Sequence, residues 1–275
     1  MANITASAVN ELRQRTGVGM MDCKKALVEC DGDMDKAIDY LREKGQKLAN
    51  KRADRDASEG CVLSATTEDK TFGAVLMLNC ETDFVAKNED FVNFTRKVLN
   101  AAIEVKAKNA GEVNALVVDG TTVENLIIEQ IAKIGEKIQL SHYETIEAPV
   151  VYSYVHPGNR LATIVSFNKT GFDVQGHDVA MQIAAMAPLA LNKDLVPADA
   201  IEREMEVYRG QIREEGKPEN MVEKIAEGKL NKFFKENTLL SQDFIKDSKK
   251  NVLQYLQESD KELTATAFYR FMLGE

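Results

Sequence analysis

The sequence predicts an α+β protein with a helical N-terminal part, two similar units that each combine a small antiparallel sheet with helices, and a helical hairpin inserted in the second unit. Up to about residue 45, apolar residues recur at helical spacing. From residue 60 onward, apolar runs of strand length are joined by polar turns. The order of two strands and a helix then recurs in the second half of the chain, which indicates two related units.

Residues 1 to about 45 are expected to form three short helices around a small common core. Thr5 suits the N-cap of the first helix and Gly17 its end, while Asp33 suits the N-cap of the third helix and Gly45 its end. Such a unit resembles the three-helix bundles of the ubiquitin-associated type, which usually bind other proteins.

Two methionines, Met20 and Met21, follow a glycine turn at the start of the second helix. Methionine is flexible and polarizable, so it suits both adaptable contact surfaces and protein cores. We expect one of the two methionines in the core of the bundle and the other exposed.

The segment at residues 46–58 is polar and basic. Its positive charges come from Lys47, Lys51, Arg52 and Arg55. A solvated helical linker is the favoured interpretation, and a small charged patch for an acidic partner surface is the alternative. Residues 1–55 are therefore assigned to the N-terminal helical domain with its linker.

The first core unit, residues 56–147, is predicted to contain two strands joined by a polar turn, two helices of which the second ends near Gly135, and a third strand. These elements are expected at residues 61–65, 72–78, 91–103, 123–131 and 138–146.

The second core unit, residues 148–275, repeats this order. A Pro-Gly turn that contains His156 separates its first two strands. The strands and helices of this unit are expected at residues 150–154, 161–167, 179–187, 251–257 and 264–273.

The two units are in register with each other. Thr82-Asp83-Phe84 and Thr170-Gly171-Phe172 both follow a strand and precede a helix, and their offset is 170 − 82 = 88 residues. The same offset aligns the strands before them. We interpret the two units as an old duplication in which the phenylalanine is kept and the acid of the first copy becomes glycine in the second.

Residues 195–235 are predicted to form two antiparallel helices separated at Gly216-Lys217-Pro218-Glu219. The second helix carries an apolar stripe formed by Met221, Ile225, Leu230, Phe233 and Phe234. We expect a hairpin of this length to leave that stripe for another surface. Self-association into a homodimer is the simplest candidate, and folding back onto the hairpin's own domain is the alternative.

The connection after the second strand of the first unit places an acid, Asp83, beside a large aromatic residue, Phe84. Connections lie on the surface and often carry function because the scaffold fixes their ends. Phe84 is therefore interpreted as a probe aimed at another protein. The alternative is a core aromatic residue that packs on the following helix, and the recurrence of Phe172 favours that alternative for at least one of the two.

Composition limits the classes of function. A net charge of −9 over 275 residues argues against a nucleic-acid phosphate backbone as the main partner. No apolar stretch approaches the ~20 residues of a membrane span. The four cysteines form no CxxC pair and no metal-ligand spacing with the three histidines, so free thiols are expected. Without secretory or transit character at the start, a cytoplasmic protein without a cofactor is expected.

Signatures of catalysis are missing from the sequence. It has no GxxxxGK[ST], GxGxxG, GxSxG or HExxH motif, and its histidines, at positions 142, 156 and 177, are scattered. An enzymatic function would depend on Asp83 as the catalytic group, and Cys80 is the second candidate for that role. We therefore predict a protein that is not an enzyme.

Two long runs resemble the signatures of a known family, bacterial elongation factor Ts. They are TGVGMMDCKKAL at residues 16–27 and NCETDFVAK at residues 79–87. EGKP at residues 215–218, followed by IAEGKL at residues 225–230, is similar to the dimerisation hairpin of that family. The similarity covers essentially the whole chain in order.

The resemblance implies a guanine-nucleotide exchange factor for elongation factor Tu in translation elongation. It implies that the N-terminal bundle docks on the GTPase domain of that partner through Met20 and Met21. It also implies that the loop at residues 82–85 (Thr82, Asp83, Phe84 and Val85) disturbs the partner's magnesium site, and that His156 touches another domain. Family members often continue into a C-terminal helix, and the sequence ending at Glu275 leads us to expect that this contact is missing.

Two rival functions remain at this stage. The first is an adaptor of the ubiquitin-associated type whose larger part binds a client protein. The second is an enzyme that uses Asp83, for which no substrate can be named. Accelerated release of a bound nucleotide from elongation factor Tu would distinguish the exchange factor from both rivals.

Overall fold

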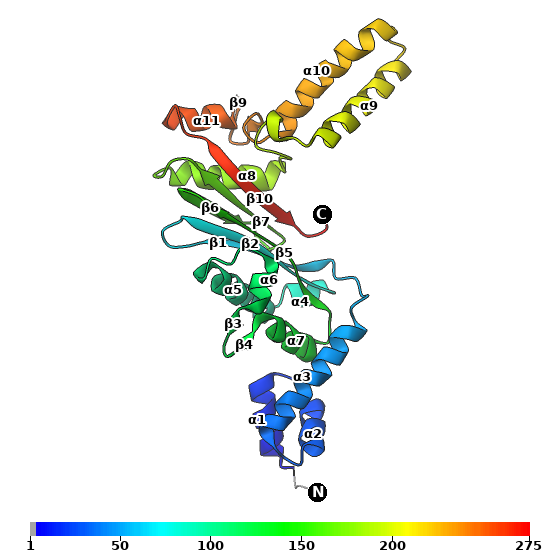
Figure 1. Ribbon diagram of the computed structural model, residues 1–275, viewed down its shortest axis with the longest axis vertical. Coiled ribbons are helices and arrows are strands. Elements are labelled where there is room, and N and C mark those ends of the chain that lie inside the picture. The colour runs from blue at the N-terminus through cyan, green and yellow to red at the C-terminus, as the bar shows by residue number, and fades with distance from the viewer. Residues whose placement is uncertain (1–3) are drawn as a thin grey trace.

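The computed structural model describes residues 4–275, and it confirms the α+β class. The molecule is elongated. A helical bundle lies at one end, two sheets with their helices form the middle, and a helical hairpin projects at the other end (Figure 1). The start of the N-terminal domain, residues 1–3, lies outside the described residues.

The N-terminal bundle consists of α1 (Ala6–Thr16), α2 (Met20–Glu29) and α3 (Met34–Lys51). As predicted, the Thr5 side chain caps α1 by accepting a hydrogen bond from the Ala8 amide, and Gly17 ends the helix at φ 68°. The buried residues of the bundle are Val9, Leu12, Val18, Cys23, Ala26, Leu27, Ala37 and Leu41.

The expectation that one of the two methionines lies in this core is wrong. Met20 is 54% exposed and Met21 is 75% exposed. The inward positions of α2 are filled by Cys23, Ala26 and Leu27, which begin one turn later, and Val18 fills the space beneath the first turn. Both methionine side chains are therefore available at the surface.

Helix α3 does not end at Gly45, as the sequence suggested, but continues to Lys51. An ideal Cβ at Gly45 would lie 3.1 Å from both the carbonyl oxygen of Ile128 and the Cβ of Ala132. These two residues belong to α7 (Val123–Ile134). Glycine at position 45 therefore lets two helices approach closely instead of ending one of them.

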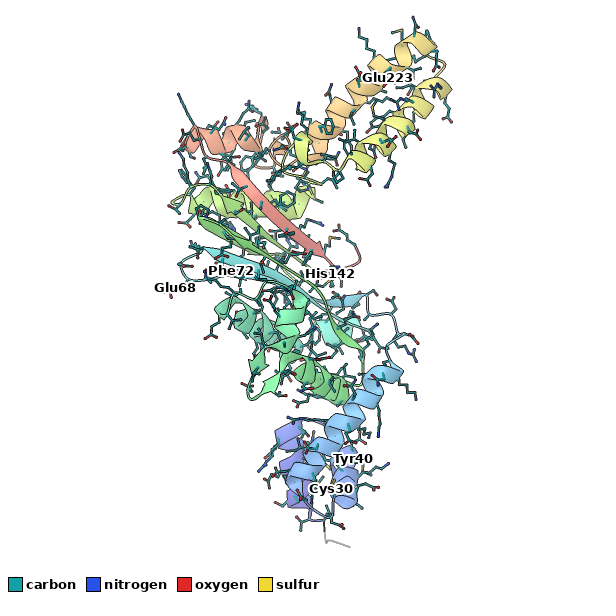
Figure 2. All side chains as sticks on the ribbon, in the orientation of Figure 1. Cys30, Tyr40, Glu68, Phe72, His142 and Glu223 are labelled. Atoms are coloured by element: carbon teal, nitrogen blue, oxygen red, sulfur yellow. The ribbon has the colours of Figure 1, made fainter. Side chains whose placement is uncertain are left out.

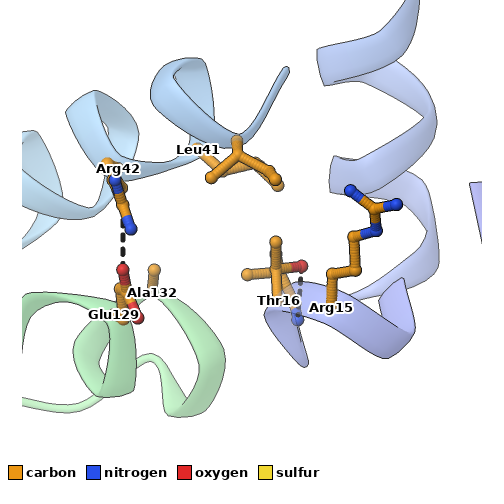
Figure 3. A pocket seen from close by; sticks show the side chains of 8 residues that line it. Arg15, Thr16, Leu41, Arg42, Glu129 and Ala132 are labelled. Atoms are coloured by element: carbon orange, nitrogen blue, oxygen red, sulfur yellow. Dashed lines mark hydrogen bonds and ion pairs between the residues drawn. The ribbon is translucent and has the colours of Figure 1, made fainter. Parts of the chain in front are cut away.

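This contact between α3 and α7 joins the bundle to the first sheet unit. The Arg42 guanidinium donates a hydrogen bond from Nε to the Glu129 carboxylate at 2.8 Å across the junction (Figure 3). A small pocket of about 160 Å³ lies between the end of α1 and these two helices. The side chains that line it, among them Arg15, Thr16 and Leu41, are labelled in the same figure.

The first sheet is antiparallel, with the strand order β1-β2-β5. Its strands are β1 (Glu59–Thr66), β2 (Phe72–Cys80) and β5 (Ile138–Glu147). The central strand β2 is buried along its whole length, because one face meets helices and the other meets the second sheet. The helical side is covered by α5 (Glu89–Glu104) and α7. Smaller elements are α4 (Asp83–Ala86), α6 (Ala110–Ala115), β3 (Val117–Val118) and β4 (Thr121–Thr122).

The second sheet has the strand order β10-β7-β6 and the same connectivity as the first. In each sheet the second strand along the chain is central, and the strand that follows the helical segment pairs on its other side. The strands are β6 (Val150–Val155), β7 (Leu161–Phe167) and β10 (Ala265–Met272). Helices α8 (Asp173–Met186) and α11 (Val252–Ser259) cover its outer face, with the short strands β8 (Asp243–Phe244) and β9 (Asp247–Asn251) beside them.

The two sheets pack face to face, so the middle of the molecule has four layers, helix, sheet, sheet and helix (Figure 1). The residues buried between the sheets are Val62, Val75, Met77, Ile146, Val151, Ala162, Ile164 and Leu273. Figure 2 labels His142, which lies on β5. Its ring lies 5.2 Å from the ring of Phe271 on β10. His142 is an exposed residue of β5 that contacts the second sheet through this ring.

Helix α8 lies unusually close to β6 at one position. An ideal Cβ at Gly176 would lie only 2.2 Å from atoms of the Tyr152 ring. That ring also packs edge-on against Phe167, with centroids 5.2 Å apart. The ring is thus held between a strand neighbour and the bare backbone of the helix, which explains why glycine occupies the middle of a helical turn.

The hairpin consists of α9 (Ala198–Glu214) and α10 (Glu219–Asn237), preceded by the 3₁₀ turn η1 (Lys193–Leu195). Ile225 and Leu230 of the predicted apolar stripe lie partly buried against the hairpin's own core, so for these two residues the expectation that the stripe is left for another surface is wrong, whereas Met221 is exposed. Met205 and Ile212 of α9 are buried against Val222 and Ala226 of α10. Ion pairs add to this packing, including the pair between Arg209 and the Glu223 labelled in Figure 2.

Candidate functional site

The loop predicted to carry the function is a tight turn followed by one turn of helix. Strand β2 ends at Cys80, and Thr82 is the N-cap of α4, with its hydroxyl accepting a hydrogen bond from the Val85 amide at 3.4 Å. Asn88 then caps α5 by accepting a hydrogen bond from the Asp90 amide at 2.8 Å. Two capping residues six positions apart therefore force the chain to turn twice, and Asp83 and Phe84 lie between the turns.

Phe84 is 83% exposed, which makes it the most exposed large apolar side chain among residues 4–275. Its counterpart Phe172 is partly buried against the core of the second sheet. The sequence left two interpretations open, an exposed probe or a core aromatic residue. Phe172 fits the second of them. An exposed phenylalanine at the tip of a capped turn is a poor arrangement for stability and a suitable one for contact with another protein.

Asp83 lies beside Phe84 on the same turn, and its carboxylate accepts a hydrogen bond from Lys87 Nζ at 2.6 Å. This hydrogen bond holds the pKa of Asp83 below its usual value, so the carboxylate is charged at neutral pH. Among residues 4–275, no group of three His, Cys, Asp or Glu side chains is placed to hold a metal ion.

The second candidate for chemistry on this loop, Cys80, is a buried thiol. Burial raises the pKa of Cys80 to about 12 and that of Cys61 on the neighbouring strand to about 11. Neither is a thiolate at neutral pH, so neither has the character of a nucleophile. All four cysteines carry free thiols, as the sequence predicted.

The underside of the loop is held by groups that the sequence did not indicate. The Glu136 carboxylate accepts hydrogen bonds from the amides of Glu81 and Thr82 at 3.1 and 3.0 Å, and from the Thr82 hydroxyl at 2.7 Å. Glu81 in turn accepts hydrogen bonds from the Lys137 amide at 2.6 Å and from the Arg52 guanidinium at 2.7 Å. The loop is therefore attached to the start of β5 and to the end of α3.

A hollow of about 260 Å³ lies next to Phe84. Its lining includes Phe91 of α5 and Lys133 and Ile134 of α7. Phe84 and the hollow together give this surface both a projection and a recess. Such a surface can interlock with a partner instead of meeting it on a flat patch.

The remaining predicted contact residues lie on separate elements. Met20 and Met21 are exposed at the start of α2, and His156 is exposed in the turn between β6 and β7. The Tyr154 hydroxyl lies 2.9 Å from His156 Nδ1 and positions its ring. A groove of about 380 Å³ separates this turn from Arg96 of α5. The structure thus brings the residues at 82–85 together and leaves the bundle and the histidine turn as separate contact regions.

Fold and site together define a class of protein. The molecule offers a rigid exposed loop with an acid and an aromatic residue at its tip, and further apolar and histidine contact points on other elements. It has the properties of a protein-binding factor. No helix in the described part of the chain has the length and hydropathy that a membrane-spanning segment requires.

Comparison with known proteins identifies the family. A family model described as elongation factor TS matches residues 81–275. The chain is 49% identical to elongation factor Ts of Christiangramia forsetii and 48% identical to that of Flavobacterium psychrophilum, over the whole length of each protein. It is 46% identical to elongation factor Ts of Porphyromonas gingivalis over 98% of both chains. The chain belongs to the elongation factor Ts family, which confirms the resemblance seen in its motifs.

Proposed function

We propose that the chain is a guanine-nucleotide exchange factor for elongation factor Tu, acting in translation elongation in the cytoplasm and without chemistry of its own. The observation that carries this proposal is the exposure of Phe84 beside the charged Asp83 on a loop held from below. In a member of this family, such a loop is suited to enter the GTPase and disturb its nucleotide site.

The proposed mechanism acts on the magnesium ion of the partner. Magnesium requires near-ideal octahedral geometry and bridges the protein to the phosphates of the nucleotide. Thr82, Asp83, Phe84 and Val85 approach that site, with Phe84 wedged between two helices of the GTPase domain. A small displacement of the magnesium ligands then costs much of the affinity for GDP. By linkage, a bound nucleotide weakens the binding of the factor by the same ratio. GTP that enters the emptied site therefore releases the factor and completes the exchange.

Insertion of the Phe84 side chain alone does not supply the whole loss of affinity for GDP. Burial of a phenylalanine side chain contributes roughly 1.5 to 3 kcal/mol, which is about one to two decades in an equilibrium constant. Larger coupling requires additional contacts that hold the factor in place. We assign these to Met20 and Met21, which dock on the GTPase domain, and to His156, which meets another domain of the partner.

We propose a division of labour that follows the architecture. Residues 1–55 form the docking domain, residues 56–147 the core unit that carries the wedge, and residues 148–275 the core unit that carries His156. The close contact of α3 with α7, in which Gly45 permits the approach, supports a fixed orientation of the docking domain relative to the loop.

Release of a fluorescent GDP analogue from elongation factor Tu tests the proposed function. Catalytic amounts of the protein are expected to accelerate release by at least about tenfold when excess unlabelled GDP traps the free site. Release that depends on stoichiometric amounts, or that does not change, would contradict exchange activity. Binding without accelerated release would favour an adaptor instead.

Self-association through the hairpin at residues 195–235 stays a prediction. Ile225 and Leu230 of the stripe pack against the hairpin's own core, and Val207 and Met221 are the large apolar side chains that α9 and α10 leave exposed. If the hairpin is the dimer contact, the full chain will sediment with twice the mass of one chain, and a variant without residues 195–235 will sediment as a monomer. The mass of a monomer for the full chain at micromolar concentration would rule out this homodimer.

A further inference from the structure

Glu136 occupies an unusual position beneath the exposed loop. It follows Gly135, the left-handed residue at φ 85° that ends α7, and it lies two residues before Ile138, where β5 begins. Because Ile138 pairs with Cys80 at the end of β2, a residue just before β5 lies opposite the residues just after β2. The chain therefore brings a carboxylate to the place where the loop leaves the sheet.

The loop has a specific need for an acceptor at this place. The amides of Glu81 and Thr82 lie beyond the last ladder pair of β2, and both point to Glu136 Oε2 at 3.1 and 3.0 Å. The other carboxylate oxygen, Oε1, accepts from the Thr82 hydroxyl at 2.7 Å. An ionised carboxylate accepts hydrogen bonds only, and bonds to a charged acceptor are about twice as strong as neutral ones.

The Thr82 hydroxyl connects this carboxylate to the tip of the loop. While it donates to Glu136, it accepts from the amide of Val85, the third residue of the single helical turn α4 that carries Asp83 and Phe84. A four-residue helix has little stability of its own, so its direction depends on its cap. The orientation of Phe84 therefore depends on Glu136 through one intermediate side chain.

A second set of bonds ties the same region to the docking domain. Glu81 accepts from the Lys137 amide and from Arg52 at the end of α3, and its side chain is only 17% exposed. Lys137 Nζ donates to the carbonyl oxygens of Ala53 and Arg55 at 2.7 and 3.0 Å. The segment at residues 136–137 is thus the point where the loop, strand β5 and the end of α3 meet.

We propose that Glu136 is a positioning residue for nucleotide exchange: it holds the loop so that Asp83 and Phe84 enter the partner in one orientation. This inference rests on the proposed function and deepens it. Glu136 does not touch the nucleotide or the metal. It acts through Thr82, and its contribution is preorganisation of the wedge before the partner is met.

Two substitutions at this position separate geometry from charge. Glu136→Ala removes every acceptor and leaves two loop amides without a partner. Glu136→Gln keeps the shape: its amide oxygen can accept from the two backbone amides, while its NH₂ group donates to the Thr82 hydroxyl. Glu147→Ala is the matched control, because Glu147 is an exposed glutamate at the far end of β5 that pairs with Lys106 and Lys108. Eight strand residues, or roughly 25 Å, separate it from the loop.

The first measurement is nucleotide release as a function of factor concentration. We expect Glu136→Ala to lower the release rate at saturation by about ten- to a hundredfold, because a misplaced wedge still docks but no longer fits. The concentration that gives half of the maximal rate should change less than about threefold, because the methionine and histidine contacts remain. Glu136→Gln should keep more than half of the wild-type rate, and Glu147→Ala all of it.

The second measurement does not depend on the partner. In hydrogen exchange of the free protein, Glu136→Ala should raise the exchange rate of the Glu81 and Thr82 amides by about tenfold or more, while Glu147→Ala leaves it unchanged. If the wild type does not accelerate release but the loop amides respond in this way, the proposed function fails and the role of Glu136 in holding the loop stands. Three results would overturn the inference. The first is a Glu136→Ala variant that releases nucleotide at the wild-type rate, and the second is an equal loss of release rate in the alanine and glutamine variants. The third is hydrogen exchange of the loop amides that does not change in Glu136→Ala.

Discussion

Replacement of Phe84 by alanine will slow the release of GDP from elongation factor Tu by about ten- to a hundredfold at limiting factor concentration, and it will leave the melting temperature of the factor unchanged. The loss corresponds to the roughly 1.5 to 3 kcal/mol that a buried phenylalanine side chain contributes when it enters the partner. Stability is spared because the side chain is 83% exposed in the free protein and packs on little of it. Stopped-flow fluorescence and thermal melting give the two quantities.

The chain offers a matched control for this result in its other repeat. Phe172 occupies the corresponding position but packs against the core of the second sheet. Phe172→Ala should therefore lower the free energy of unfolding by about 2 kcal/mol and leave the release rate of the folded protein unchanged. A Phe84→Ala variant that exchanges nucleotide at the normal rate would show that the wedge mechanism is wrong.

The largest effect on stability is expected at Gly176. Gly176→Ala places a methyl group 2.2 Å from atoms of the Tyr152 ring, which cannot retreat because Phe167 packs on it. Alanine gains about 1 kcal/mol over glycine in a helix, but overpacking of a filled core costs about 1 to 3 kcal/mol and sometimes more. Because this overlap is extreme, the steric cost exceeds the gain in helix propensity. We expect the free energy of unfolding, measured in urea, to fall by about 2 kcal/mol or more.

Two other helical glycines test the reasoning with the opposite sign. An ideal Cβ at Gly210 of α9 or at Gly228 of α10 meets no atom within 4 Å. Gly210→Ala and Gly228→Ala should therefore stabilise the protein, each by up to about 1 kcal/mol. If Gly176→Ala also stabilised it, the helix would have to be able to move away from β6, and the close contact could not be a fixed feature of the fold.

Most of the architecture could be predicted from the sequence because its signals are local. The caps at Thr5 and Gly17, the apolar runs of the strands and the break before Glu219 each act within a few residues. The errors came from tertiary contacts. Gly45 has the local properties of a helix end, but the approach of α7 is what makes glycine necessary there. Likewise, Ile225 and Leu230 of the apolar stripe of α10 pack against a core that α10 shares with α9, which a single helical pattern cannot show.

The candidate site divides along the same line. Asp83 and Phe84 could be found because an acid and an aromatic residue on a connection, with a related loop for comparison, form a local signal. The exposure of both Met20 and Met21 could not be predicted, because it depends on which residues of α2 face the core of the bundle. Glu136 could not be found at all. It is one acid among 44, and its meaning arises only when β5 pairs with β2 and brings it beneath a loop 54 residues earlier in the chain.

The face-to-face packing of the two sheets has a consequence for how such a chain can evolve. Each repeat contributes half of the buried layer between the sheets, so Val75 of one and Ile164 of the other are constrained by the same space. The loops carry no such mutual restraint. One repeat can keep an acid and turn its phenylalanine outward, while the other adopts a glycine and turns its phenylalanine inward. The shared interior therefore restrains both halves together, whereas the loops at its edges can change independently.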